Sequence, residues 1–206
     1  VMARYTGPKV RISRRLSVNI FENEKGRQAL ERRPFPPGQH GRTRRRNAGS
    51  EYLAQMQEKQ KVRFTYGINE RQFRTLYAEA SRKTGVTGEN LLRFCELRLD
   101  NIVYRLGFGA SRRQARQLVR HAHFLVNGKK VTIPSFTVRK GDVVELGEKA
   151  KAMIVIRHNL DTLDRAIPAW LDVVAGSAKA TVNDLPIREQ IDIPVREQLI
   201  VELYSK

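Results

Sequence analysis

The first fifty residues constrain the fold most, because they combine a high positive charge with residues that interrupt regular structure. This segment holds 13 basic and 3 acidic side chains and includes the run Arg32-Arg33-Pro34-Phe35-Pro36-Pro37-Gly38. Proline and glycine at this density prevent a long helix. A segment so charged cannot bury enough apolar surface to fold by itself. We therefore predict that residues 1–49 form a basic, extended arm that becomes ordered on binding a partner.

The positive charge of the whole chain is concentrated in two blocks. The net charge is +18, of which residues 1–50 carry +10 and residues 101–150 carry +7, whereas the remaining blocks are near neutral. Arginine forks match phosphate oxygens, so two arginine-rich blocks indicate local surfaces for a phosphate-bearing partner. A merely solvated surface is the alternative. A membrane is disfavoured, because neither block supplies the apolar anchors of a membrane-surface helix. Nucleic acid is the favoured partner.

Several classes of protein are excluded by simple counts. No apolar run approaches the roughly 18 residues that a membrane span requires, and residues 1–20 lack the apolar stretch of a secretory signal. The single cysteine, Cys95, excludes a disulfide scaffold, a cysteine-rich zinc module and an iron–sulfur cluster. We expect a cytoplasmic protein with no cofactor, and Cys95 is interpreted as a core residue.

From Ser50 the apolar residues recur at helical intervals. The pattern predicts three amphipathic helices, over 50–67, 69–85 and about 89–106. We assign residues 50–98 to a small helical domain, completed by residues 185–206. Within that last segment, the spacing of Val195, Leu199 and Leu203 favours a helix, whereas the run Leu199-Ile200-Val201 favours a strand. Helix is the preferred interpretation.

Residues 99–184 predict an α+β domain with an antiparallel sheet. Ser111 can cap a helix of about a dozen residues, and Asn127-Gly128 is a preferred dipeptide for a tight hairpin turn. Strands are predicted on both sides of that turn, at Phe124–Val126 and Lys129–Val131, and further on at Val143–Leu146, Met153–Ile156, Leu171–Val174 and Lys179–Val182. The predicted fold class is α+β: an extended basic N-terminal arm, a small helical domain and an inserted α+β module at about 99–160.

Catalytic signatures are weak. The chain lacks a phosphate loop, a full dinucleotide fingerprint and a nucleophile elbow. Arg98-Leu99-Asp100 resembles the short motif that carries the catalytic aspartate of pseudouridine synthases, which would make the chain an RNA-modifying enzyme. It lies within a helical pattern, so an ion pair between Asp100 and a neighbouring arginine is favoured. A DNA-compacting protein is a third hypothesis. We predict no catalytic residues, no small-molecule substrate and no metal at His121-x-His123.

The helix and hairpin after residue 110 predict an RNA surface. Arg112, Arg116 and Arg120 recur at i, i+4 and i+8, away from the apolar stripe, and the hairpin adds Asn127 and two lysines. A-form RNA presents phosphates and 2′-hydroxyls rather than an open major groove. Cations from two elements can grip such a backbone by shape. Reversing the charge of Arg116 and Arg120 is therefore expected to weaken RNA binding without unfolding the domain.

These residues resemble a known family. Ser111–His121, Val126–Val131, Ile133-Pro134-Ser135 and Gly141-Asp142 look like the S-four RNA-binding module. Other segments resemble the bacterial S-four family of small-subunit ribosomal proteins. They are Ala3-Arg4-Tyr5-x-Gly7-Pro8, Pro37-Gly38-Gln39-His40-Gly41, Glu58-Lys59-Gln60-Lys61, Glu70-Arg71-Gln72-Phe73-Arg74, Thr87–Leu92, Arg98–Asn101 and Glu202–Ser205.

The resemblance implies a non-enzymatic protein that binds 16S rRNA early in assembly, at a multi-helix junction of the 5′ domain. It also implies contact with ribosomal protein S-five at an interface linked to translational accuracy. A position near the channel through which mRNA enters would make mRNA a further partner. Some members carry a four-cysteine zinc site in the arm, but Val10 and Ser13 stand at its first two positions here. Valine cannot ligate zinc, so no metal is predicted.

Three groups of residues are the predicted RNA contacts. In the arm they are Arg4, Lys9, Arg14, Arg15, Gln39, His40, Arg44, Arg45 and Arg46. On the helical domain they are Lys59, Lys61, Arg63, Arg71 and Arg74. In the module they are Arg112, Arg113, Arg116, Arg120, Asn127, Lys129 and Lys130.

Overall fold

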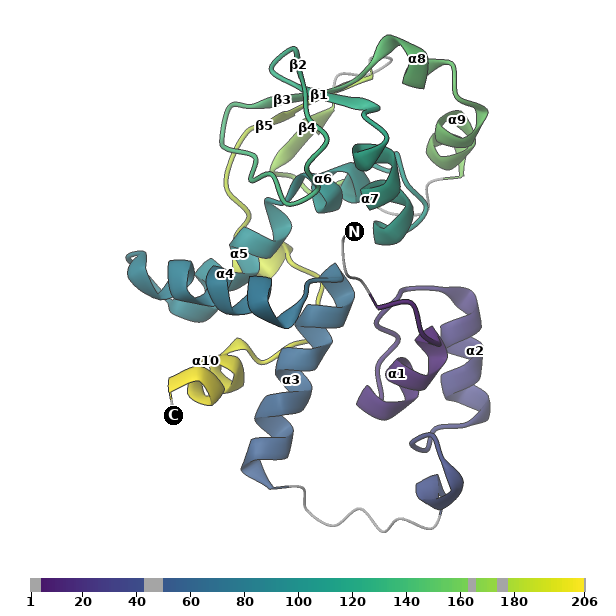
Figure 1. Ribbon diagram of the computed structural model, residues 1–206, viewed down its shortest axis with the longest axis vertical. Coiled ribbons are helices and arrows are strands. Elements are labelled where there is room, and N and C mark those ends of the chain that lie inside the picture. The colour runs from purple at the N-terminus through teal and green to yellow at the C-terminus, as the bar shows by residue number, and fades with distance from the viewer. Residues whose placement is uncertain (1–4, 43–49, 163–165, 174–177, 206) are drawn as a thin grey trace. The chain divides into compact units, whose positions relative to one another are not determined.

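Helices in the first half of the chain, and an antiparallel sheet with further helices in the second half, make up the structure (Figure 1). A computed structural model describes residues 5–42, 50–162, 166–173 and 178–205. The elements in chain order are α1 (Lys9–Leu16), α2 (Glu24–Arg32), η1 (Gln39–Gly41), α3 (Glu51–Tyr66), α4 (Glu70–Arg82), α5 (Thr87–Glu96), α6 (Leu99–Arg105), α7 (Arg112–Arg120), β1 (Phe124–Val126), β2 (Lys129–Lys130), β3 (Val143–Leu146), α8 (Glu148–Lys151), α9 (Ile154–Asp161), β4 (Leu171–Val173), β5 (Lys179–Val182), η2 (Arg188–Gln190) and α10 (Glu197–Ser205). The α+β class is confirmed.

The chain divides into two compact units. The first comprises Val1–Thr75 with Ile193–Lys206, and the second comprises Leu76–Asp192. The sequence predicts three domains, at 1–49, at 50–98 with 185–206, and at 99–184. That these segments fold independently stays a prediction. In the described ranges, none of the helices combines the length and apolarity needed to span a membrane.

In the first unit, the C-terminal helix α10 lies along α3 (Figure 1). The preferred helical interpretation of the C-terminal segment is confirmed. The ends of α3 follow the predicted signals, since the Ser50 side chain accepts a hydrogen bond from the Leu53 N–H and Gly67 adopts φ +63°. Lys59 on α3 and the Tyr204 hydroxyl on α10 both donate to Glu70 at 2.9 Å. This shared carboxylate joins the three elements.

The N-terminal segment contains two helices that the sequence analysis missed. Helices α1 and α2 lie side by side, and Ile12, Leu16 and Ile20 form a small buried cluster. The expectation of an extended arm is therefore wrong for these residues. Pro8 can precede a helix, and an eight-residue helix needs only one apolar i, i+4 pair to pack. Such a pattern is too short to stand out within a highly charged segment.

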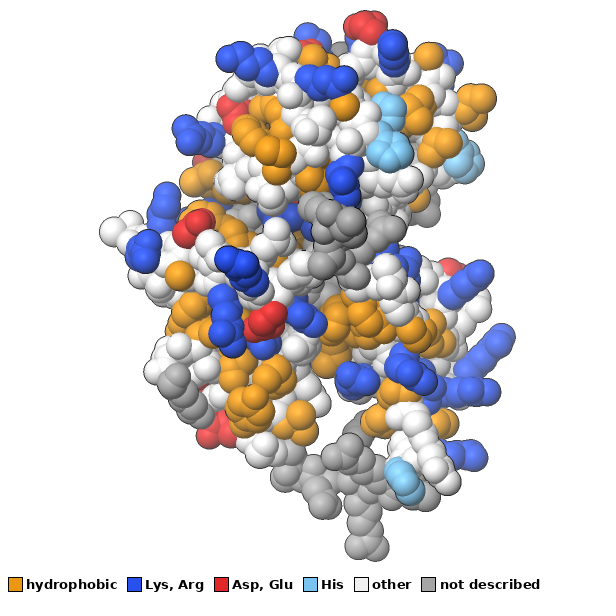
Figure 2. All heavy atoms as spheres, in the orientation of Figure 1, with side chains coloured by type: hydrophobic (Ala, Val, Ile, Leu, Met, Phe, Trp, Pro, Cys, Tyr) orange, Lys and Arg blue, Asp and Glu red, His pale blue; other side chains and the backbone are white. Residues whose placement is uncertain are grey.

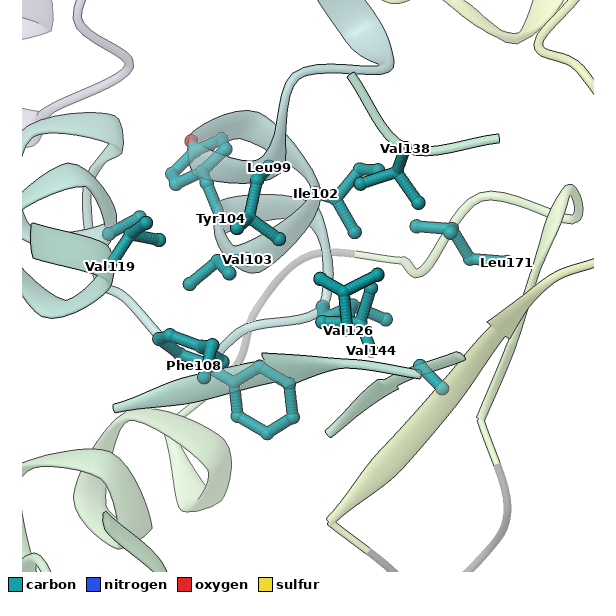
Figure 3. Packing of buried hydrophobic residues seen from close by; sticks show 14 of the residues in the cluster. Leu99, Ile102, Val103, Tyr104, Phe108, Val119, Val126, Val138, Val144 and Leu171 are labelled. Carbon is teal, nitrogen blue, oxygen red and sulfur yellow. The ribbon is translucent and has the colours of Figure 1, made fainter. Parts of the chain in front are cut away.

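In the second unit, a sheet in the order β2-β1-β3-β5-β4, antiparallel throughout the described strands, packs against α6 and α7. Figure 3 shows Ile102 and Val103 of α6 directed towards Val126 and Val144 of the sheet, with Val119 of α7 beside them. All five are 4 % exposed or less. The strand predictions that correspond to β1, β2, β3, β4 and β5 are confirmed, with their described ends within one residue. Val174, the predicted end of β4, lies outside the described residues.

Two element predictions are wrong. The single helix expected over 89–106 is broken into α5 and α6. The backbone between them instead bonds to an extended segment, as Val138 N–H donates to the Leu97 carbonyl and Leu99 N–H to the Phe136 carbonyl. The strand expected at 153–156 is the start of α9, in which Ile156 and Asn159 are the buried positions. That three-residue spacing is helical, so the β-branched run misled the prediction.

Candidate nucleic-acid interface

Helix α7 is positioned by its apolar stripe and its cap. The Ser111 hydroxyl accepts a hydrogen bond from the Gln114 N–H at 3.3 Å, and Ala115, Leu118 and Val119 are buried against the second unit's core. Both features agree with the sequence analysis. They leave the arginines of α7 on its other faces, as predicted, but these arginines have different neighbours.

Arg116 is engaged with a buried carboxylate. Its Nε and Nη2 lie 2.8 and 2.7 Å from Asp100 Oδ2, and Arg98 forms a two-point ion pair with the same carboxylate at 3.1 and 2.9 Å. The Arg116 side chain is 11 % exposed and Asp100 is 6 % exposed. The favoured interpretation of Asp100, an ion pair with neighbouring arginine, is confirmed. Most of the Arg116 side chain is therefore engaged inside the protein, and its predicted contact with RNA stays a prediction.

Arg112 is engaged on α6 as well. Its Nε donates to Asn101 Oδ1 at 3.0 Å and its guanidinium lies 4.4 Å from the centre of the Tyr104 ring. Asn101 in turn donates to Glu96, which forms a buried two-point ion pair with Arg105 at 2.8 and 3.0 Å. Arg112 therefore ties α7 to this internal network.

Arg120 and Arg113 complete the arginines of α7. Arg113 is half-buried, and Arg120, at the C-terminal end, is exposed. Of the predicted arginine face, Arg120 is thus the side chain most open to a partner.

Asn127 joins two turns rather than pointing outward. Its Nδ2 donates to Asp142 Oδ1 at 2.8 Å, and its Oδ1 accepts from the Val143 N–H at 2.9 Å. Asp142 also accepts from the Arg139 N–H at 2.7 Å. With φ +51° at Asn127 and +73° at Gly128, this is the left-handed turn that the dipeptide predicts. The two turns are therefore held together as one rigid edge.

This edge carries a basic surface, which we call the hairpin rim. It consists of the exposed Lys129, Lys130, Arg139 and Lys140. Lys140 forms a surface ion pair with Asp184 at 3.0 Å. Sequence reasoning found the two lysines beside Asn127-Gly128 but missed Arg139 and Lys140. The signal was present, since they precede the second turn at Gly141-Asp142 in a similar way.

His121 and His123 lie near this rim, and their ring centres are 6.1 Å apart. The pKa of His123 is lowered, mainly because the side chain is partly buried. Electrostatic interactions with the neighbouring His121 and Lys130 lower it further. Among the residues with described positions, no group of three His, Cys, Asp or Glu side chains is arranged to hold a metal.

The predicted contacts on the helical face divide in two. Lys59 is buried against Glu70, Lys61 pairs with Glu58 at 2.6 Å, and Arg63 stacks on Phe64 at 4.7 Å. Arg71 and Arg74 are exposed on α4. Glu70 is the carboxylate at the centre of this region. Burial alone would raise its pKa, but hydrogen bonds from Lys59 and Tyr204 outweigh the burial, so the pKa of Glu70 is lowered.

In the arm, Arg14 and Lys9 make internal contacts, whereas Arg15, Gln39 and His40 are exposed. Lys9 lies 5.7 Å from the Phe21 ring centre, and Arg14 lies 5.0 Å from that of Phe35. The remaining predicted arm contacts, Arg4, Arg44, Arg45 and Arg46, lie outside the described residues.

Cys95 is fully buried in the second unit, as predicted for a core residue. Burial raises the pKa of its thiol to about 12. The thiol therefore stays protonated at neutral pH and is not a nucleophile.

A helix packed on an antiparallel sheet, beside a rigid cation-bearing edge, defines this chain as a protein with an RNA-binding module. Comparison with known families agrees: residues 97–144 match the S4 domain, and residues 4–96 match the Ribosomal protein S4/S9 N-terminal domain. The chain is 57% identical over 206 residues to Small ribosomal subunit protein uS4 of Rhodococcus opacus (strain B4), covering 100% of both chains. Over 208 residues it is 56% identical to the protein of that name from Nocardioides sp. (strain ATCC BAA-499 / JS614), again covering 100% of both.

The chain therefore belongs to the uS4 family of small ribosomal subunit proteins. This membership confirms the predicted family and the predictions of a ribosomal, non-enzymatic, cytoplasmic protein. The RNA-modifying hypothesis based on Asp100 is set aside.

Proposed function

We propose that this chain is a primary 16S rRNA-binding protein, which nucleates small-subunit assembly at a multi-helix junction of the 5′ domain. The observation that carries the proposal is the hairpin rim. Its four cations project from two turns that Asn127 and Asp142 lock together. The one carboxylate between those turns, Asp142, already accepts two hydrogen bonds from the protein. A rigid, preorganised set of cations can match the phosphate spacing of a folded junction better than a flexible tail can.

The proposed contacts fall into two roles. We assign direct contact with RNA to the exposed side chains, namely Arg15, Gln39, His40, Arg71, Arg74, Arg120, Lys129 and Lys130, with Arg139 and Lys140 added. Arg14, Lys59, Arg112, Arg116 and Asn127 are assigned a positioning role, because they bind other parts of the protein. Lys9, Lys61, Arg63 and Arg113, which are partly buried, can contribute through the side-chain surface that remains exposed.

Two protein-level roles rest on family membership and on full-length similarity to uS4 proteins. We propose contact with ribosomal protein S-five that contributes to translational accuracy, and a location near the channel through which mRNA enters. Purified S-five should bind small-subunit particles reconstituted with this chain more tightly than particles reconstituted without it. Equal binding to both particles would overturn the S-five proposal. A photo-crosslinker on mRNA at the entrance should label this chain if the location is right.

The rRNA proposal is tested by binding to a 16S 5′-domain fragment and to a random RNA duplex of equal length, across a salt titration. The decisive variant reverses two rim charges, Lys129→Glu with Lys130→Glu. Its matched control, Lys149→Glu with Lys151→Glu, makes the same change of charge on α8. We expect the rim variant to weaken fragment binding at least about tenfold, with a salt slope shallower by roughly 0.9 for each phosphate that the variant no longer neutralises.

Three outcomes would count against the proposal. Equal losses in the two variants would mean that net charge, not the rim, drives binding. Equal affinity for fragment and duplex at all salt concentrations would remove junction recognition. A DNA duplex bound as tightly as the fragment would favour the DNA-compacting alternative.

A further inference from the structure

A second basic surface lies in the arm, over α1, α2 and the turn at 33–42. Figure 2 shows Lys and Arg side chains gathered over this part of the molecule. Two adjoining hollows open here, of about 440 and 290 Å³. The first is lined by Arg14, Arg32, Arg33, Phe35, Gly38 and Arg42. The second is lined by Val10, Arg14, Lys25, Gln28, Ala29, Arg32 and Arg33. Because three arginines line both hollows, we treat them as one groove and call it the arm groove.

The wall of the groove is a built turn. Arg14 Nε lies 3.3 Å from the Arg33 carbonyl oxygen and 3.2 Å from that of Phe35, and its Nη2 donates to the Pro36 carbonyl at 3.3 Å. A side chain on Gly41 would overlap that same Pro36 carbonyl, and Gly38 adopts φ +107°. One arginine and two glycines therefore hold residues 33–42 in a defined conformation.

The charge of the groove is one-sided. Its lining includes five cations, Arg14, Lys25, Arg32, Arg33 and Arg42, and among the described residues that line the two hollows there is no Asp or Glu. The acidic side chains of α2, Glu24 and Glu31, form ion pairs with Arg27 instead. Five like charges gathered in one groove repel each other unless an anion lies among them. Arg32, Arg33 and Arg42 are exposed, so their guanidinium groups are available to such an anion.

The shape of the groove favours a strand over a compact ion. A hollow of about 440 Å³ is in the range that holds a small organic ligand, which is larger than a phosphate needs. The ring centre of Phe35 lies 5.0 Å from the guanidinium of Arg14 and 5.7 Å from that of Arg42, and Val10 and Ala29 offer apolar surface in the second hollow. Cations that follow a backbone, beside aromatic and apolar side chains, are features of sites that bind unpaired nucleotides.

We propose that the arm groove binds a single-stranded RNA segment of at least two consecutive nucleotides. In this site Arg32, Arg33 and Arg42 contact the phosphates, and Arg14 is a positioning residue that shapes the turn. The proposal rests on the proposed function, because it adds an unpaired strand to the structured rRNA recognised elsewhere. It gives the arm a role of its own, distinct from the hairpin rim.

The test uses the full chain and a short single-stranded oligouridylate, with binding followed by fluorescence anisotropy across a salt titration. The site variant is Arg32→Gln with Arg33→Gln. The matched control is Arg11→Gln with Arg82→Gln, which removes the same charge from exposed positions outside the groove lining. We expect the site variant to weaken binding about tenfold and to make the salt slope shallower by about 1.4, from about 0.7 for each single-strand phosphate that is no longer neutralised. The control should change affinity less than about twofold.

A second variant separates shape from charge. Arg14→Lys keeps the charge but cannot reach three carbonyls in one plane, so it should also weaken binding of the oligonucleotide. Unchanged binding in Arg14→Lys would overturn its positioning role. Equal losses in the site and control pairs, or none in either, would overturn the groove. Inorganic triphosphate competing as well as the oligonucleotide at equal charge would mean a small-anion site instead.

The two proposals can fail separately. The 16S 5′-domain fragment is measured with the same variants and with the hairpin-rim variant. If the fragment is preferred over the duplex but the site and control pairs bind oligouridylate equally, only the arm groove is wrong. If the fragment is not preferred at all, the proposed function fails, whatever the oligouridylate shows.

Discussion

The arm and the second unit both carry a net positive charge, but they hold their arginines in different ways. In the second unit, which has a large apolar core, two buried carboxylates, Asp100 and Glu96, form ion pairs with arginines inside the protein. In the described part of the arm, three apolar residues form the buried cluster, and Arg14 is held by backbone carbonyls and an aromatic ring.

The difference teaches how a basic sequence separates structural cations from binding cations. An arginine beside a buried carboxylate is neutralised within the fold, and its removal costs stability. Arginines gathered without a carboxylate keep their charge for an external anion. Fewer cations are therefore exposed on the second unit than its composition indicates, and Arg120 and the hairpin rim are among those that are exposed.

The largest expected effect tests the internal ion pairs. Asp100→Asn would leave Arg98 and Arg116 with no neutralising carboxylate at a site that is about 5–11 % exposed. Removing one partner of a buried ion pair costs about 3–5 kcal/mol. We expect a loss of this size in the free energy of unfolding, measured by urea denaturation.

Its control is Asp184→Asn, which removes the partner of Lys140 from an exposed ion pair. That change should cost less than about 1 kcal/mol. If Asp100→Asn were no more costly than the control, the second unit would not be organised around this carboxylate, and the comparison with the arm would break down.

An intermediate effect is expected in the arm. Gly41→Ala places a Cβ against the Pro36 carbonyl, so the turn at 33–42 must shift, at a cost of about 1–3 kcal/mol for an overpacked contact. Hydrogen exchange should become faster in α1 and α2 but not in the second unit. Gln39→Ala, at an exposed neighbouring position, is the control and should leave exchange unchanged. Faster exchange in both units would show that the arm is not separately organised.

The smallest expected effect is a loss of stability at low pH. It concerns the ion pair between Lys59 and Glu70, which is less buried than the ion pairs of the second unit and is therefore an intermediate case in the comparison. Lys59 is 7 % exposed but its partner Glu70 is 32 % exposed, so this carboxylate is only partly shielded. The pKa of Glu70 is lowered from 4.5 in the folded chain, because hydrogen bonds from Lys59 and Tyr204 outweigh its burial. Its contribution to stability is therefore present above about pH 4.5 and is lost as the pH falls through the lowered value.

Hydrogen exchange of α10 should report this loss, with protection relative to intrinsic rates falling as the pH is lowered below about 4.5. Tyr204→Phe removes one hydrogen bond to Glu70, so it should lower stability at neutral pH by about 0.5–1.5 kcal/mol and lessen the acid dependence. An unchanged acid profile in Tyr204→Phe would show that the hydroxyl does not hold α10 in place.

Local patterns predicted most of the second unit. β3 and β5 were found residue for residue, because β-branched runs flanked by glycine turns are short-range signals. The break between α5 and α6 was not found, because its backbone groups are satisfied by residues about forty positions away in the chain. The helices of the arm were missed because one apolar pair is too weak a pattern among so many charges.

The site was predicted by residue type but not by role. Arg120, Lys129 and Lys130 are exposed as expected, whereas Arg112 and Arg116 are tied to α6. Helical spacing placed Arg112, Arg116 and Arg120 on one side of α7, but it could not show that Asp100 and Asn101 bind two of them. Of the cations of the arm groove, Arg14 was predicted, whereas Lys25, Arg32, Arg33 and Arg42 were missed because their grouping depends on the turn at 33–42.

What the sequence by itself determined is the set of local features: the helix caps, the Asn-Gly turn, the apolar stripes, the two basic blocks and the resemblance to one family. These depend on neighbouring residues in the chain, so they can be read along it. Only the tertiary structure decided which cations are engaged in internal ion pairs and which face outward. That division depends on carboxylates and carbonyls brought close in space by the fold, because an arginine binds whichever acceptor lies within hydrogen-bond distance, however distant in sequence.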